Sequence, residues 1–305
     1  MSTPLRTSRR TWTAILAVSL IVVLVGFGCA KKHPAGTGSS AANGSASLVF
    51  KKDSKIVLEQ TAFLFEGAPQ IVDPSHDKRD IVLTAFHPGI DADLSWQITQ
   101  LVLTDESKKA QQAFVDHGST GTAPEAKYGQ LMGAGTLPGV DLRSTHHLGT
   151  PLSWAIGEGA PSRSSEIWVS EDVYRELSRT QSSTVYLDIP LEGVLSAAAG
   201  SPSLLKLVTD IKAHATSVGD RTDADLMKVT EKLAAYPIKV NGKDATVPVI
   251  KAKNWYGEIT VLDTPQNPLV LAFDFHPPMD GITAKPEDVK LLNGLLSYQI
   301  IEIDP

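Results

Sequence analysis

The chain has 305 residues, 42% of them hydrophobic and 20% charged, which is the composition of a globular protein rather than a disordered one. Its formal net charge is −6 and we find no basic stripe, which argues against a nucleic-acid partner. The single cysteine excludes a disulfide within the chain, so the fold has to depend on its hydrophobic core.

The N-terminus begins with a positively charged segment followed by an apolar run. Arg6, Arg9 and Arg10 precede residues 13–27, which are uncharged and almost wholly aliphatic. This order is typical of an export signal. About 20 residues are needed to span a bilayer, so the run is short for a permanent membrane helix. Residues 8–12 also resemble a twin-arginine export motif, although the strongly apolar run argues against that route.

The apolar run ends in Gly26-Phe27-Gly28-Cys29, which resembles the cleavage box of bacterial lipoproteins. In that family, small residues precede a cysteine that receives acyl chains such as palmitate and becomes the new N-terminus. The resemblance implies a signal peptide over residues 1–28 and a lipid anchor on Cys29. The protein would then lie in the cell envelope, outside the cytoplasm, and Ala30 after the cysteine implies the outer membrane and the periplasm if the host has them. The alternatives are an uncleaved signal anchor with an inert cysteine, and a soluble product.

Residues 29–47 are dominated by Gly, Ser and Ala and predict a flexible tether. Residues 1–28 contain three arginines and no acidic residue, so their removal changes the formal charge from −6 to −9. An acidic body of this kind has no electrostatic attraction to anionic lipid. Lipid and tether would therefore have to supply the membrane attachment of a single globular domain over residues 48–305.

Segments rich in β-branched and aromatic residues predict strands in the first part of this domain. They cover residues 55–65, 80–86, 94–103, 145–156, 166–169 and 183–189. Short helices are expected over residues 106–115 and 171–179, the second capped by Ser170. The Gly- and Pro-rich stretch 118–139 predicts a long loop.

A helical hairpin is expected near residues 202–235, as an insertion over 201–235. Ser201-Pro202 is a helix start, and Gly219 stops that helix. Its apolar face holds Leu204, Leu207, Val208, Ile211, Ala215 and Val218. A second helix is expected to start at Thr222, with an apolar stripe made of Leu226, Val229 and Leu233.

Asn241-Gly242 predicts a two-residue type I′ hairpin turn between strands over residues 236–240 and 245–252. Strands at 258–262 and 269–275, a helix at 285–296 and a closing strand at 298–303 follow. Local hairpins with segregated helices predict an α+β or mainly-β fold with antiparallel strands.

Four histidines are the candidate metal ligands, and zinc is the ion they would suit. His146 and His147 are adjacent, so on a strand they would point to opposite faces and could not easily share an ion. His87 and His276 each follow a predicted strand and could converge with one of the pair. Ordinary surface or turn histidines are the simpler interpretation.

Other chemistry is less well supported by the residues. No G-x-S-x-G motif occurs, and Ser164-Ser165 lies in a polar loop without a partner that the sequence can assign. Trp255-Tyr256 follows polar residues in an expected loop, and an exposed pair there could stack on a sugar or anchor a protein.

The sequence therefore favours a lipid-anchored cell-envelope lipoprotein whose domain binds an envelope protein or glycan, or supports an assembly. The alternative is an envelope hydrolase, which in a metal-dependent form would use His146 or His147 with His87 or His276. The sequence identifies neither a substrate nor a reaction.

Overall fold

We describe the protein from a computed structural model of the whole chain. The structure describes residues 48–65, 68–71, 78–118, 122, 124–154, 156–162, 164–188, 202–217, 225–277, 279, 282 and 284–305. The chain divides into two units, Met1–Asn43 and Gly44–Pro305, and every element below belongs to the second. Cys29, the predicted signal peptide and the predicted tether lie outside the described residues.

The described residues form one large sheet, two pairs of short strands and four α-helices. The helices are α1 (Asp105–Asp116), α2 (Glu171–Thr180), α4 (Pro202–Ser217) and α6 (Pro286–Leu296), with one 3-10 turn, η1 (Pro151–Ser153). The strands of the large sheet are β1 (Lys55–Glu59), β4 (Lys78–His87), β5 (Asp91–Leu103), β6 (Tyr128–Asp141), β8 (Gly157–Glu158), β9 (Ser182–Thr184), β11 (Leu226–Val240), β12 (Lys243–Lys253), β13 (Gly257–Leu262), β14 (Val270–Phe275) and β15 (Tyr298–Asp304). The short pairs are β2 (Ala62–Phe65) with β3 (Ala68–Ile71), and β7 (His147–Leu148) with β10 (Tyr186–Leu187).

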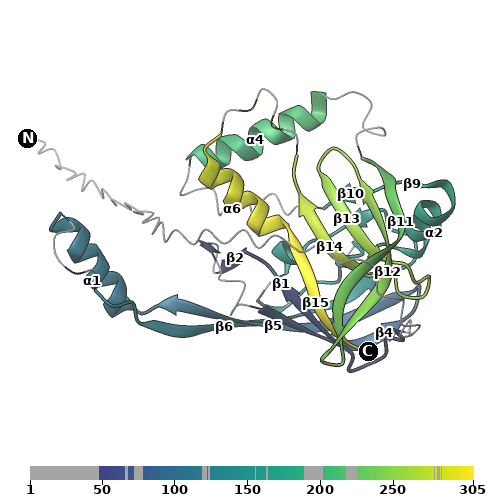
Figure 1. Cartoon of the computed structure of the whole chain (residues 1–305), viewed down its shortest axis with the longest axis horizontal. Helices are drawn as coiled ribbons and strands as arrows, with labels where there is room; N and C mark the ends of the chain where they lie inside the picture. Colours follow the sequence, from purple (N-terminus) through teal and green to yellow (C-terminus); the bar gives the residue numbers. More distant parts are fainter. Residues whose placement is uncertain are drawn as a thin grey trace, which may run out of the picture. The chain divides into compact units, whose positions relative to one another are not determined.

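Five consecutive strands, β11 to β15, close into a ring (Figure 1). Antiparallel neighbours pair in chain order from β11 to β15, and β15 then pairs with β11 in parallel, Glu302 lying opposite Lys239. Closure is possible because one edge of β15 pairs first with β14, at Tyr298 and Gln299, and then with β11. Apolar side chains that alternate inward along these strands fill the ring.

The sheet continues from the other edge of β15 through β1, β4, β5, β6 and β8. β4 pairs with β5 only as far as Ile98. Beyond that point residues 99–103 pair with β6 alone among the described strands, and α1 follows at the end of this two-stranded arm (Figure 1). Side chains on the inner face of β1, β4 and β5 join the same hydrophobic core as those of the ring.

Helices cover parts of the sheet and complete the core. α6 contacts β14, β2 and β3 as well as α4, while α2 contacts β9, β11 and β12. The face of α4 predicted to be apolar is confirmed where it is described, because Leu204, Leu207, Val208 and Ile211 are all buried. Burial of each such side chain contributes about 1.5–3 kcal/mol.

The expected fold class, α+β or mainly β with antiparallel hairpins, is confirmed. Local signals located several elements well. The Ser170 side chain accepts a hydrogen bond from the Val173 N–H and caps α2, as predicted. Asn241 and Gly242 have φ angles of 49° and 72°, which is the left-handed conformation that a type I′ turn requires.

The second helix of the predicted hairpin is wrong, because residues 226–240 form the long strand β11. The expected apolar stripe is not a buried face, because Leu226 and Val229 are only partly buried and Leu233 is 73% exposed. Pairing with β12 makes the segment a strand and buries Met227 and Ala234 instead. The register shifts between Val229 and Glu231, and again between Lys232 and Ala234, as at bulges that insert a residue into the alternation of a strand.

The predicted loop over residues 118–139 is also wrong where β6 runs through it. Its glycines suit the strand because they lie opposite large side chains: Gly135 pairs with Trp96, and Gly133 pairs with Ile98. A large neighbour can cover the backbone of a strand glycine, so the missing side chain leaves no gap.

Two further predicted strands are shorter than expected. Residues 145–156 contain only the two residues of β7 before η1, and residues 166–169 contribute a single bridge between Trp168 and Leu269.

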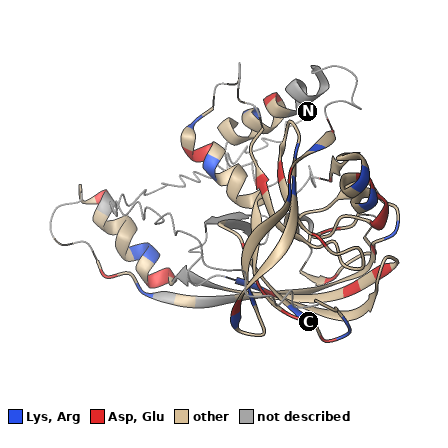
Figure 2. Ribbon diagram, turned by 45° about the vertical axis from the view of Figure 1, so that its right-hand side comes forward, with Lys and Arg blue, Asp and Glu red and all other residues tan. Residues whose placement is uncertain are grey.

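Lys and Arg are scattered among Asp and Glu over the described elements (Figure 2). No helix in the described part of the chain is both long and apolar enough to cross a membrane.

Candidate functional site

A buried polar cluster lies on the inner face of the sheet, and we call Arg79, Trp96, Trp154, Ser162, Ser164 and Glu166 the Trp154 cluster. Strand alternation explains how β4 supplies a charge to it, because Arg79 points inward whereas Asp80 is exposed. Ile98 on β5 pairs with Arg79 on β4. Trp96 lies two residues from Ile98 on the same strand and therefore points to the same face of the sheet. Trp154 follows η1, and Glu166 lies just before the bridge residue Trp168.

Arg79 is a buried cation whose exposed fraction is only 4%. Its guanidinium carbon lies 4.7 Å from the ring centroid of Trp96 and 5.0 Å from that of Trp154. Its Nη1 donates to the carbonyl oxygen of Pro151 at 2.8 Å, but its Nε has no partner among the described residues. None of the described carboxylates forms an ion pair with it, so the two indole faces take the place of a counter-ion.

Desolvation by burial lowers the pKa of Arg79 to about 9. The side chain therefore remains a cation at neutral pH.

Glu166 is the second buried ionisable group, with an exposed fraction of 3%. Its Oε1 accepts hydrogen bonds from Ser162 Oγ at 2.5 Å and from Ser164 Oγ at 2.8 Å. Its Oε2 accepts from Trp154 Nε1 at 2.8 Å. Burial raises the pKa of Glu166, a rise that these three hydrogen bonds oppose and that the charge of Asp188 reinforces.

The backbone around Glu166 is held in an unfavourable conformation. Glu166 has a φ of 53°, in the left-handed region that a residue with a Cβ rarely adopts. Gly149 lies against the cluster, where a Cβ would collide with the carboxylate of Glu166 and with the hydroxyl of Ser164. Such strain persists only where the surrounding structure imposes it, and it is frequent at functional sites.

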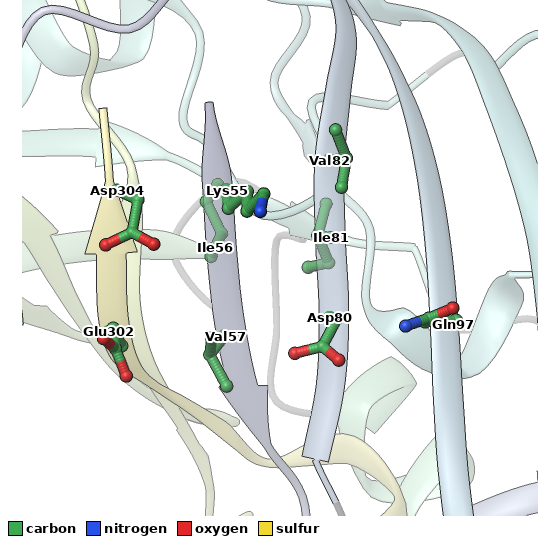
Figure 3. A pocket seen from close by; sticks show the side chains of 9 residues that line it. All are labelled: Lys55, Ile56, Val57, Asp80, Ile81, Val82, Gln97, Glu302 and Asp304. Atoms are coloured by element: carbon green, nitrogen blue, oxygen red, sulfur yellow. The ribbon is translucent and has the colours of Figure 1, made fainter. Parts of the chain in front are cut away.

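A hollow of about 390 Å³ lies on the outer face of the same strands (Figure 3). Its walls come from β1, β4, β5 and β15, and its polar side chains are Lys55, Asp80, Gln97, Glu302 and Asp304. The pairing of β1 with β4 and β15 explains why these side chains lie together. Val57 on β1 lies between Asp80 on β4 and Glu302 on β15, and Lys55, two residues earlier on β1, lies opposite Asp304.

The hollow presents hydrogen-bond acceptors and an excess of negative charge. It has three carboxylates and one ammonium group among its lining side chains. Oδ1 of Asp304 is buried and has no hydrogen-bond partner among the described residues. A ligand that donates hydrogen bonds or carries positive charge would complement this surface.

The four candidate histidines are each engaged locally. His87 Nδ1 contacts Asp91 Oδ1 at 2.6 Å, and His146 Nδ1 contacts the carbonyl oxygen of Thr184 at 2.8 Å. The ring of His147 lies 5.2 Å from that of Tyr186, and His276 lies 3.6 Å from Asp274. In the described part of the chain, no three His, Cys, Asp or Glu residues are grouped so that they could hold a metal ion.

Trp255 and Tyr256 do not form the exposed aromatic surface that the sequence suggested. Tyr256 is buried, and its hydroxyl donates to the carbonyl oxygen of Val185 at 2.7 Å. Trp255 is partly buried, and its Nε1 donates to Asp225 Oδ1 at 3.3 Å. The two rings meet edge to face within the protein, so Tyr256 offers no face to a ligand.

Sequence reasoning missed the Trp154 cluster because its members come from separate segments. The one local signal was the alternation of Ser162, Ser164 and Glu166, which places two hydroxyl groups beside a carboxylate. Nothing in the sequence indicates that Trp154 or Arg79 joins them.

Comparison with protein-family models, with curated proteins and with solved structures found no match to this chain. The functional argument therefore depends on the geometry described above.

Proposed function

We propose that the chain is a lipid-anchored cell-envelope protein whose globular unit binds an envelope protein or glycan, or supports an assembly there. The observation that carries the proposal is Cys29, which follows an apolar run and three arginines as in bacterial lipoproteins. Acyl chains on Cys29 would attach the protein to the membrane, and residues 30–47 would act as the tether.

The hollow on the outer face supports a binding role. Asp80, Glu302 and Asp304 line it, and carboxylates accept hydrogen bonds from sugar hydroxyls or pair with basic side chains. These groups lie on strands of a sheet whose other face belongs to the core, so their positions are fixed before a ligand arrives. A preorganised surface loses less conformational entropy on binding.

The lipid anchor is tested with Cys29→Ser in the full-length chain. We expect this variant to move from the membrane to the soluble fraction or to accumulate as the uncleaved precursor, while the matched tether variant Ser39→Ala stays on the membrane. Mass spectrometry of the native protein should show residues 1–28 removed and fatty acid on the new N-terminus. An intact Met1, or a trimmed end without fatty acid, contradicts the proposal.

The binding role is tested by co-sedimentation with purified cell-wall polysaccharide and, separately, by titration with a lysine-rich peptide. Asp80→Asn combined with Glu302→Gln should weaken binding about tenfold or more, because both changes remove charge without changing side-chain size. Glu258→Gln, on β13 and outside the hollow, is the matched control. Equal binding by all three proteins contradicts a role for the hollow.

A hydrolase is the second candidate, favoured by the contact between the Ser162 hydroxyl and Glu166. Zinc-dependent hydrolysis through His87, His146, His147 or His276 is a separate form of this candidate. About one equivalent of zinc in the purified full-length protein would support the zinc-dependent form.

A further inference from the structure

Ser162 and Glu166 lie together as a nucleophile and a base would. The Ser162 hydroxyl lies 2.5 Å from Glu166 Oε1, within the reach that proton transfer requires. Ser162 is partly buried whereas Glu166 is buried, so Ser162 is the more exposed residue of the pair. Ser164 also contacts Glu166, but it is only 3% exposed and cannot meet a substrate directly.

The carboxylate is held in one orientation by groups other than Ser162. Trp154 Nε1 donates to Oε2 at 2.8 Å, and Ser164 Oγ donates to Oε1 at 2.8 Å. In the usual arrangement a nucleophile contacts a base, and a third group holds that base in position. Trp154 and Ser164 would supply this third component. The backbone N–H of Ser164 also donates to Ser162 Oγ at 3.1 Å, which would stabilise negative charge on that oxygen.

From these contacts we infer that Ser162 is a catalytic nucleophile and Glu166 its general base, in a site that hydrolyses carboxylic esters. The inference deepens the hydrolase candidate and rests on it, but it is independent of the proposed binding function, because the hollow lies on the opposite face of the sheet and Cys29 is not involved.

The burial of Glu166 affects its strength as a base. Burial raises its pKa, which makes the carboxylate a stronger proton acceptor once it is ionised. Asp188 and Tyr298 are the ionisable groups that interact with Glu166 electrostatically. The guanidinium of Arg79 packs against the ring of Trp154 and forms no ion pair with Glu166.

The reaction would proceed in two balanced steps. Ser162 Oγ attacks the ester carbonyl carbon and its proton passes to Glu166; the bond to the leaving alkoxide then breaks, and Glu166 returns the proton to it. Water next attacks the acyl group on Ser162 and gives a proton to Glu166, which returns it to Ser162 as the carboxylic acid departs. An ester is the expected class, because an alkoxide leaves more readily than an amide nitrogen.

The test uses the full-length chain in detergent and a fluorophosphonate probe, which labels activated serines. We expect an adduct that peptide mass spectrometry locates on Ser162, and slow hydrolysis of p-nitrophenyl acetate. Ser162→Ala should abolish both, and Glu166→Gln should slow labelling by about 100-fold or more. Ser165→Ala is the matched control, because its hydroxyl bonds to the carbonyl of His147 instead and its loss should leave labelling unchanged.

Labelling of the unmodified protein keeps the inference falsifiable even if a variant fails to fold. Circular dichroism should show that each variant is folded before its rate is interpreted. An unlabelled protein, or an adduct on a serine other than Ser162, overturns the inference. Unchanged labelling in a folded Glu166→Gln variant also overturns it.

Discussion

Trp154 contacts two buried ionisable groups of the protein core, Arg79 and Glu166, which form no ion pair with each other. The Arg79 guanidinium carbon lies 5.0 Å from the centroid of its ring, while its Nε1 donates to Glu166 Oε2 at 2.8 Å. One side chain thus stabilises a cation through its π face and a carboxyl group through its N–H group. The contribution of these contacts to the free energy of unfolding can be measured.

The polar part of this role can be isolated by comparing two tryptophans of the same cluster. Trp154→Phe removes the donor to Glu166, and we expect it to cost about 1–3 kcal/mol of unfolding free energy because a buried carboxyl oxygen loses its hydrogen-bond partner. Trp96→Phe removes an Nε1 that has no partner in the described part of the chain, so it should cost clearly less. Urea denaturation followed by circular dichroism gives both values. Equal losses would mean that ring packing alone accounts for the effect.

Glu166 should make stability depend on pH. Its pKa is raised above 4.5, so the folded state binds its proton more tightly than the unfolded state does. The contribution to stability is therefore fully present below about pH 4.5 and is lost as the pH rises through the folded pKa, by at most about 1.4 kcal/mol per pH unit. We expect the unmodified protein to lose stability relative to Glu166→Gln over this interval, with denaturation midpoints compared from about pH 4.5 to 8. A constant difference between the two proteins would refute the assignment.

Two buried tyrosines differ in whether their hydroxyl groups have partners. Tyr256 donates to the carbonyl oxygen of Val185 at 2.7 Å, and Tyr256→Phe should cost about 1–3 kcal/mol because it leaves that buried oxygen unpaired. The hydroxyl of Tyr298 is buried without a partner among the described residues, so Tyr298→Phe should be neutral or slightly stabilising. Thermal unfolding of both variants checks the contrast, and a larger loss for Tyr298→Phe would contradict it.

Leu233 is a site where a substitution should stabilise the protein. It lies at the second bulge of β11 with a φ of 56°, and its side chain is 73% exposed. Asparagine tolerates the left-handed conformation better than leucine does, so Leu233→Asn should raise the unfolding free energy by about 0.5–1 kcal/mol. Leu233→Ala retains the Cβ and is the control for loss of the exposed apolar surface. If alanine stabilises as much as asparagine, backbone strain is not the reason.

The sequence by itself determined the structural elements that arise from interactions between residues close together in the chain. Ser170 caps α2, Pro202 begins α4, and Asn241-Gly242 turns the hairpin between β11 and β12. Capping and turn formation involve backbone groups only a few residues apart, so their signals can be read locally.

Only the tertiary structure decided where bulges, glycine-rich strands and buried charges belong. β11 is a strand because it pairs with β12 despite the helix-like spacing of its apolar residues, and β6 is a strand because β5 supplies side chains opposite its glycines. Arg79 meets the carbonyl of Pro151 across 72 residues of sequence, and Trp154 meets Glu166 across 12. Such contacts form because strand pairing and core packing bring distant segments together, and no local pattern records that outcome.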